Sequence, residues 1–299
     1  MRTLMIAVLG VGATSSFVRA DSATINPDQD NVLCHSATGA LSNGTGDIFI
    51  GGTSQSGPQR RGVVRFNIGS AGIPAGSTIN SVTLRLYLVK TGDTTSRTIA
   101  VHKATASWGE STSYFNGGVC DSSDSNDATW IHRFHSGTAW AAAGGDYTGA
   151  ASGSASAGNT WNTWHTWSSA GMKSDVQAWI ATPASNHGWV LISNSELTSQ
   201  TARRYTSREA VDDTGDHYPE LVIDYTPPPG FTGRAAPKPT HLGGFKLLGE
   251  RDLDGDGIQD LVLRDEKRDR LLGGHRVRGG LVIWEHVVNR SSTDPLAVP

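Results

Sequence analysis

The chain of 299 residues has room for one large domain and a second, small one. Charged residues make up only 18% and glycines number 36, which is typical of an all-β protein with many turns and excludes a coiled coil or a helical bundle. The formal net charge of −3 is too small to indicate a nucleic acid or an anionic membrane as a partner, and no long apolar run after the N-terminus could span a bilayer.

Residues 1–20 have the pattern of a signal peptide. Arg2 supplies the positive charge, LMIAVLGVGA the short apolar segment, and VRA the small-residue cleavage site after Ala20. A first core strand and a retained anchor are the alternatives. Cleavage predicts a mature chain that starts near Asp21 and is secreted, as an extracellular or cell-surface protein.

Cys34 and Cys120 are the two cysteines of the chain. An oxidising compartment outside the cell permits a disulfide between them. The sequence gives no geometry, so a disulfide and two separate buried thiols remain equally open at this point.

Short strand-like runs alternate with turns from Asp47 onward. In SVTLRLYLVK the residues Val82, Leu84, Leu86 and Leu88 share one face, and polar residues share the other. This alternation of apolar and polar residues, with one solvent-exposed face, indicates an antiparallel sheet. Similar runs occur in RRGVVRFNI, RTIAVHKAT, ATWIHRF, GWVLISN and PELVIDYT.

One helix is predicted within SSAGMKSDVQAWIATP. Met172, Val176, Trp179 and Ile180 lie at helical spacing, and Pro183 follows where the helix should end. Many short strands and one short helix favour an antiparallel β-sandwich over residues 21–226, with a closed barrel as the weaker alternative.

The sandwich is followed by a change in composition. Residues 227–241 are rich in proline, lack periodicity and are predicted to form a semi-rigid linker. Residues 242–299 then have room for a small β module.

The segment NTWNTWHTWSS places tryptophans at positions 161, 164 and 167. On an unbroken strand, Trp161 and Trp167 share one face and Trp164 the other. The first two are expected in the core, because large rings bury large apolar areas. Trp164 is the candidate for stacking against the C–H face of a sugar.

Four blocks of sequence, in order, resemble the DNRLRE-domain proteins, which are grouped with family 96 carbohydrate-binding modules. The blocks are QRRGVVRFNIGSAGIPAGSTINSVTLRLYL, ATASWGEST, DVQAWIATPASNHGWVLIS and RRYTSRE with YPELVIDY. The resemblance covers residues 34–226 and implies a secreted, jelly-roll-like β-sandwich that binds polysaccharides, with alginate-like uronates as the known ligand class. The long insert at residues 117–159 departs from the shorter members.

Arginines are the candidate contacts for a uronate, because a guanidinium matches a carboxylate in a two-pronged geometry. Arg203 and Arg204 begin one predicted strand, and we predict that they contact the acidic ligand. The alternative is that arginines pair within the protein and hold strand ends together, which concerns Arg61, Arg208, Glu110 and Glu209.

The segment DLDGDGIQD is the sharpest chemical pattern in the chain. Its carboxylates and one backbone carbonyl are placed to surround a cation, at Asp252, Asp254, Asp256, Ile258 and Asp260. Hard oxygen ligands in a flexible loop suit Ca²⁺ better than Mg²⁺. Leu263 stands where an EF-hand has Glu, and GFKLLGERDLDGDGIQDLVLRDE resembles a single FG-GAP/VCBS-type calcium repeat. The alternative is an acidic turn without an ion.

Catalytic motifs are lacking: the sequence contains no G-x-S-x-G, H-E-x-x-H or Walker loop. Glu110, Glu196 and Glu209 are the carboxylates that a glycosidase would need, but nothing in the sequence brings two of them together. The sequence therefore predicts a non-catalytic polysaccharide-binding protein. A structural or adhesive cell-envelope protein is the alternative, followed by a polysaccharide lyase or glycosidase.

Overall fold

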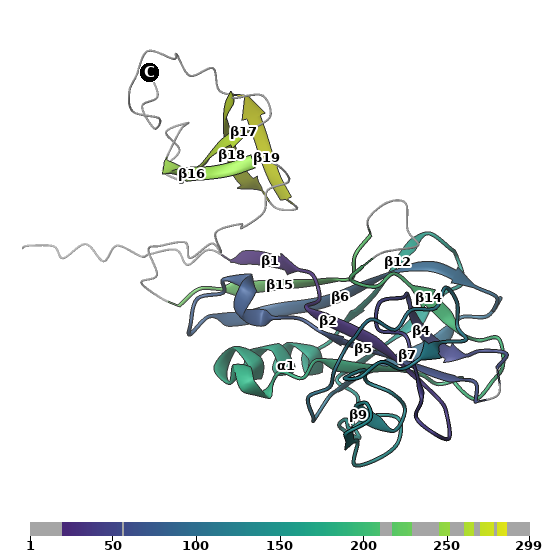
Figure 1. Ribbon diagram of the computed structural model, residues 1–299. Helices are drawn as coiled ribbons and strands as arrows, with labels where there is room; N and C mark the ends of the chain where they lie inside the picture. Colours follow the sequence, from purple (N-terminus) through teal and green to yellow (C-terminus); the bar gives the residue numbers. More distant parts are fainter. Residues whose placement is uncertain are drawn as a thin grey trace, which may run out of the picture. The chain divides into compact units, whose positions relative to one another are not determined.

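The chain divides into two units, residues 1–236 and 237–299. The computed structural model describes, in full, residues 20–55, 57–209 and 217–228, and as backbone strands, residues 245–251, 260–265, 270–277 and 280–285 (Figure 1). Each unit is therefore described by itself. The predicted signal peptide lies outside the described residues apart from Ala20, and so does most of the predicted linker.

Eleven strands form one antiparallel sheet in the first unit, and this sheet curls into two layers. The first layer contains β1 (Asp21–Ile25), β4 (Ile48–Gly52), β6 (Thr78–Thr91), β12 (Thr163–Ser168), β14 (Arg203–Tyr205) and β15 (Glu220–Thr226). The second contains β2 (Gln29–Cys34), β5 (Gln59–Arg65), β7 (Arg97–Lys103), β11 (Gly153–Ala157) and β13 (Trp189–Ser193). The predicted all-β antiparallel sandwich is confirmed.

The main core lies between the two layers. Val82, Leu84, Leu86 and Leu88 of β6 are all fully buried, as the alternation predicts, and they pack in one cluster with Trp167 of β12 and inward residues of the second layer. The opposite side chains of β6 point out of the sandwich. This alternation leaves one polar outer face on the first layer.

The sheet turns from one layer into the other at two glycines of β4. Residues Ile48–Ile50 pair with β14, whereas Gly51 and Gly52 pair with Arg60 and Gln59 of β5. Gly51 has a φ of +125°, and a Cβ on Gly52 would lie 2.0 Å from the carbonyl oxygen of Thr198. Only glycine fits this corner, because any side chain would collide with backbone.

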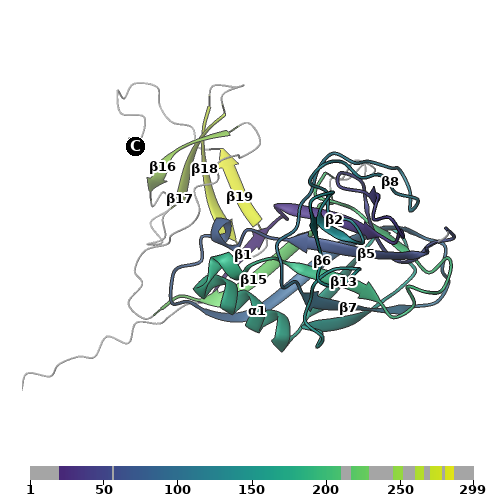
Figure 2. The same ribbon diagram turned by 60° about the horizontal axis from the view of Figure 1, so that its bottom comes forward.

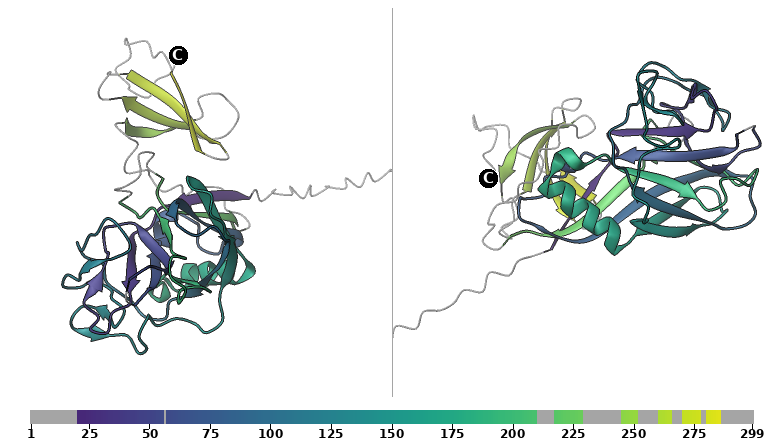
Figure 3. Two further views of the ribbon diagram at one scale, coloured as in Figure 1. Left: turned by 90° about the vertical axis from the view of Figure 1, so that its right-hand side faces the viewer. Right: turned by 90° about the horizontal axis from the view of Figure 1, so that it is seen from below.

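The helix α1 (Ala170–Ala181) lies at one end of the sandwich (Figures 2 and 3). The Ser169 hydroxyl accepts a hydrogen bond from the Met172 amide and so caps its first turn. Met172, Val176 and Trp179 are buried in the main core, as predicted. Pro183 begins a short 3-10 turn, η2 (Pro183–Ser185), beyond the helix; a second 3-10 turn, η1 (Ile68–Ala71), precedes β6.

In the structure the insert comprises residues 104–152, between β7 and β11, rather than the predicted residues 117–159, and it packs on the outer face of the second layer. Its residues Trp108, Trp130 and Trp140 are buried against outward residues of that layer such as Val63 and Val190. Its short strands are β8 (Asp121–Ser122), which pairs with β3 (Leu41–Ser42), and the pair β9 (His132–Phe134) and β10 (Thr138–Ala139). Figure 1 shows β9 and β12 on opposite sides of the sandwich. Another part of the insert, at Gly118 and Cys120, packs on Phe49 at the outer side of β4.

The second unit contains a four-stranded antiparallel sheet. Its strands follow the chain order β16 (Phe245–Arg251), β17 (Asp260–Asp265), β18 (Arg270–Val277) and β19 (Gly280–Glu285). Within the part of the chain that the structure describes, no helix has the length and apolar character needed to cross a membrane.

Candidate functional site: a basic and aromatic pocket beside β6 and β14

A pocket of about 360 Å³ opens where β6 ends and its antiparallel neighbour β14 begins. It is called the β6–β14 pocket below and is lined by Phe49, Lys90, Thr91, Gly92, Asn116, Gly117, Gly118, Ala202 and Arg204. Lys90 and Arg204 are opposite each other in the strand pairing, so both side chains leave the same face of the sheet. The lining therefore combines two cations with an aromatic ring.

Trp161 stands beside this pocket and is 51% exposed. Its indole nitrogen donates a 3.0 Å hydrogen bond to the carbonyl oxygen of Thr91, a lining residue. The Lys90 ammonium lies 5.8 Å from the centre of the indole ring. The exposed ring, the cation and the pocket are therefore neighbours.

The prediction that Trp161 belongs to the core is wrong. The strand β12 begins at Thr163, and Asn162 before it has a φ of +56° in the left-handed region. This turn breaks the alternation on which the prediction rested, because the rule of two residues per repeat holds only within a strand. Trp167, which is on the strand, is 1% exposed and lies in the core as predicted.

Trp164 lies half-buried on the outer face of the first layer, at the position opposite Tyr87. The Arg85 guanidinium lies 4.4 Å from its ring centre, and Tyr87 and His217 meet the ring edge-on at 5.2 and 5.8 Å. The expected outward orientation is present. Its contact with a sugar stays a prediction. Arg85, Tyr87 and His217 lie against the ring and reduce the surface that a sugar could reach.

The prediction that Arg203 contacts a ligand is contradicted by its burial. Arg203 is 0% exposed and points into the sandwich. Its guanidinium donates hydrogen bonds of 2.6 to 3.1 Å to backbone carbonyls, those of Thr95, Ala157, Gly158 and Thr201. Strand parity explains the difference, since of two successive residues on a strand only one can face outward.

Arg204 is that outward residue, and it lines the β6–β14 pocket. Its Nε donates to Asp47, and its guanidinium lies 5.8 Å from the ring centre of Phe49. The ion pair fixes the position of the guanidinium on the pocket wall. The structure thus keeps one of the two predicted arginines as a candidate contact.

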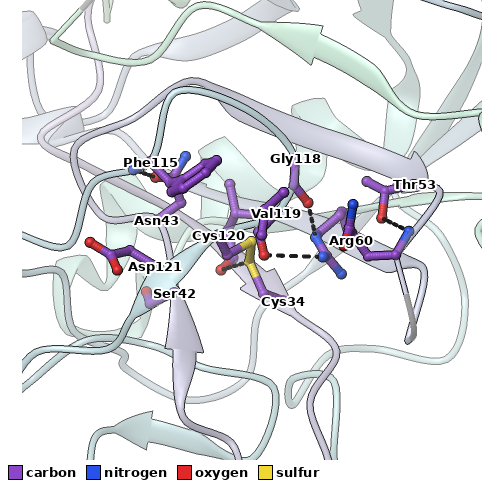
Figure 4. The surroundings of a disulfide bond; sticks show 12 residues. Cys34, Ser42, Asn43, Thr53, Arg60, Phe115, Gly118, Val119, Cys120 and Asp121 are labelled. Atoms are coloured by element: carbon purple, nitrogen blue, oxygen red, sulfur yellow. Dashed lines mark hydrogen bonds between the residues drawn. A yellow bond between two sulfur atoms is a disulfide. The ribbon is translucent and has the colours of Figure 1, made fainter.

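The pocket rim formed by Asn116–Gly118 is fixed from below by a disulfide and a buried arginine (Figure 4). Cys34 of β2 is bonded to Cys120, which answers the question that the sequence left open. Arg60 is 1% exposed and donates to the carbonyl oxygens of Gly118 and Val119. Burial lowers the pKa of Arg60 to about 10, so it stays charged at neutral pH.

A second cluster of charged residues lies elsewhere in the sandwich. Arg208 Nε donates to Glu110 at 2.7 Å, and Arg208 Nη2 lies 2.9 Å from Glu209, so the ion pairing considered from the sequence is present. Burial raises the pKa of Glu110 to about 7. Glu196, by contrast, pairs with Arg61 at 2.7 Å.

Sequence reasoning missed Asp30, which joins this cluster from β2 and is fully buried. Burial is the largest cause that raises its pKa well above the ordinary value, and Glu110 and Glu209 add to it. A signal was present in QDNVLC, where polar residues occupy positions on a strand that is buried on both faces.

The predicted calcium loop lies outside the described residues, except that Asp260 is the first residue of β17. The assignment of Asp252, Asp254, Asp256 and Ile258 to a metal therefore stays a prediction.

Comparison with known proteins does not place the chain in a family: no family model matches it, and no curated protein matches it significantly.

Proposed function

We propose that the protein is a secreted, non-catalytic polysaccharide-binding protein and that the β6–β14 pocket with Trp161 holds an acidic glycan. The observation that carries this proposal is the exposed Trp161 indole next to a pocket walled by Lys90 and Arg204. An exposed tryptophan beside two cations suits the apolar face and the carboxylates of a uronate chain.

The chemistry of a uronate suits the two kinds of group. Each sugar has an apolar C–H face, which stacks on an indole, and a carboxylate, which pairs with a cation. Because the Lys90 ammonium lies 5.8 Å from the centre of the Trp161 ring, both side chains can contact one sugar residue at the same time. Arg204, directly opposite Lys90 in the strand pairing, is placed for the next carboxylate along the polymer.

One structural observation and one sequence resemblance support the proposed export and the proposed class of ligand. The Cys34–Cys120 disulfide suits an oxidising compartment, as the predicted signal peptide requires. The resemblance of residues 34–226 to DNRLRE-domain proteins implies polysaccharide binding with uronates as ligands. We further propose that Asp252, Asp254, Asp256, Ile258 and Asp260 hold a Ca²⁺ ion that stabilises the C-terminal unit.

The test is affinity gel electrophoresis and calorimetry with sodium alginate, with dextran as the neutral polymer. We expect retardation by alginate alone, and Trp161→Ala should weaken binding by about five- to tenfold, or about 1.0–1.4 kcal/mol. Lys90→Ala should weaken binding and reduce its dependence on salt, since a screened charge contact is lost.

Matched variants separate the pocket from general effects. Trp161→Phe keeps a ring and should bind better than Trp161→Ala. Arg65→Ala removes a half-exposed cation, paired with Asp28, that does not line the pocket, and it should leave binding unchanged. Unaltered alginate retention by Trp161→Ala and Lys90→Ala, with folding intact, would refute this site.

The other two function classes are outcomes of the same experiments. Release of unsaturated ends from alginate would identify a lyase, and release of reducing sugar a glycosidase. No retention by any polymer of a glycan array would favour a structural or adhesive protein of the cell envelope.

A further inference from the structure

Three carboxylates from distant parts of the chain converge in the sandwich. Asp30 lies on β2, Glu110 follows Trp108 in the insert, and Glu209 follows β14. One oxygen from each lies within 4.8 Å of the other two. We infer that Asp30, Glu110 and Glu209 bind a divalent cation, with Ca²⁺ as the best fit, at a site separate from the DLDGDGIQD loop.

The hydrogen bonds of the cluster do not engage every carboxylate oxygen. The Arg208 guanidinium pairs with Glu110 and Glu209, and the Arg208 backbone amide donates to Asp30 Oδ2 at 2.7 Å. Asp30 Oδ1 and Glu209 Oε2 are buried and have no hydrogen-bond partner. Asp30 is 0% exposed, so bulk water cannot satisfy its second oxygen.

An unpartnered buried carboxylate oxygen is costly, and three carboxylates together repel one another. The two orphaned oxygens are a sign of a missing ligand. A metal ion can contact an oxygen of all three carboxylates at once and offsets their charge, whereas a water molecule donates to two at most and leaves the charge in place.

The charge of the cluster specifies the valence. Three carboxylates and the single guanidinium of Arg208 leave a net charge of −2 when all are ionised. A divalent cation neutralises that charge completely. A monovalent ion would leave a buried negative charge, which the low-dielectric interior disfavours.

The irregular ligand set favours Ca²⁺ over Mg²⁺. The three oxygens lie within 4.8 Å of one another, so all three can contact one Ca²⁺ ion. Mg²⁺ demands a near-ideal octahedron, which three carboxylates from distant segments do not supply. Carbonyl groups and water complete the six to eight ligands that Ca²⁺ prefers, in a geometry that tolerates irregularity.

Binding would add to the contacts that already join these three segments, which include the ion pairs of Arg208, the Cys34–Cys120 disulfide and the hydrogen bond from the Asp30 amide to Glu110 Oε2. The ion would cross-link β2, the insert and the segment after β14, and so stabilise the sandwich.

The experiment uses the full chain with Asp252→Asn, Asp254→Asn and Asp256→Asn, which removes the proposed loop site. Thermal unfolding is followed, in EDTA and in millimolar CaCl2, by the near-ultraviolet circular dichroism of the tryptophans, eight of the nine of which lie in the sandwich. For a dissociation constant one hundred times below the calcium concentration, the Tm should rise by about 5–10 °C. Calorimetry should count one Ca²⁺ per chain.

Glu110→Gln in that background separates binding from structure. The neutral amide relieves repulsion, so the variant should melt higher than its parent in EDTA and yet lose the calcium-dependent rise. Glu209→Gln and Asp30→Asn should lose the rise as well, and either serves if the first variant does not fold. Glu196→Gln, which breaks the ion pair with Arg61, is the matched control and should keep the rise.

Two results would overturn the inference. One is a loop variant whose sandwich shows neither a calcium-dependent Tm shift nor bound Ca²⁺. The other is a shift that persists in Glu110→Gln and Glu209→Gln, because it would then come from another site. In either case the cluster is held by a shared proton, and the proposed glycan binding at the β6–β14 pocket is unaffected.

Discussion

Arg60 and Arg203 show how an arginine can be a structural donor rather than a ligand contact. Both are buried and direct their guanidinium groups at backbone carbonyls of loops, at Gly118 and Val119 in one case and Thr95 and Gly158 in the other. A guanidinium has five N–H donors in a rigid plane, so it can donate hydrogen bonds to several loop carbonyls at once. Composition alone cannot separate this use from carboxylate binding.

His165 makes the stability of the sandwich depend on pH. It lies on the inner side of β12, where its ring nitrogen Nδ1 is 2.8 Å from the Tyr205 hydroxyl. Burial, and secondly the charge of Arg203, lower its pKa to about 4.

The folded state therefore binds a proton on His165 less tightly than the unfolded chain does. The contribution of neutral His165 to the free energy of unfolding is therefore fully present above pH 6.5, and it is lost as the pH falls from 6.5 through about 4. In His165→Gln the Tm should fall less over this interval than in the wild type. Parallel melting curves for the two proteins between pH 6.5 and 4 would contradict the assignment.

At the scale of elements, the helix α1 depends on a single capping residue. Ser169 accepts from the Met172 amide and donates to the Ser152 carbonyl, so one hydroxyl caps the helix and ties it to the chain before β11. Ser169→Ala should cost about 1 kcal/mol, or about 2–4 °C in Tm, measured by thermal or urea unfolding.

Ser174→Ala is the matched control for the cap. Its hydroxyl donates to the Ala170 carbonyl within the helix and is exposed, so its loss should be neutral or slightly stabilising. Equal effects of the two substitutions would show that the cap contributes nothing specific.

The strands and the helix were predictable because each has its own period. The alternation of Val82, Leu84 and Leu86 and the helical spacing of Met172 and Val176 both follow from local geometry, and both sets are buried. The corner at Gly51 and Gly52 and the break at Asn162 were not predictable. They depend on positive φ angles and on backbone that approaches from distant segments, neither of which leaves a periodic signal.

At the scale of the whole molecule, the Cys34–Cys120 disulfide closes a long loop, with a sequence separation of 86. Cys34→Ser with Cys120→Ser should destabilise the fold by about 4–5 kcal/mol in the entropic model, measured by urea unfolding. Because Gly118 lies on the pocket rim two residues before Cys120, the variant should also bind alginate more weakly. Unchanged affinity would mean that Arg60 alone holds the rim.

The candidate site was predictable only in part. The outward side chains of Trp164 and Arg204 follow from strand parity once the register is known, but the parity of Arg203 could not be chosen from the sequence. The three-carboxylate cluster unites residues 30, 110 and 209, and no local pattern links positions so far apart. Long-range convergence of this kind depends on the tertiary fold, which a single sequence does not reveal.

The first and last strands of the sandwich are neighbours: Asp21 of β1 is opposite Tyr225 of β15, and Thr226 is opposite Thr78 at the start of β6. The pocket residues Lys90 and Thr91 lie at the other end of β6, roughly 40 Å away at about 3.3 Å per residue. The ends of the sandwich at Asp21 and Thr226 thus both lie at the far end of β6 from the pocket. Attachment of the sandwich to a support through either end would therefore place the attachment point at the opposite end of β6 from the proposed glycan site.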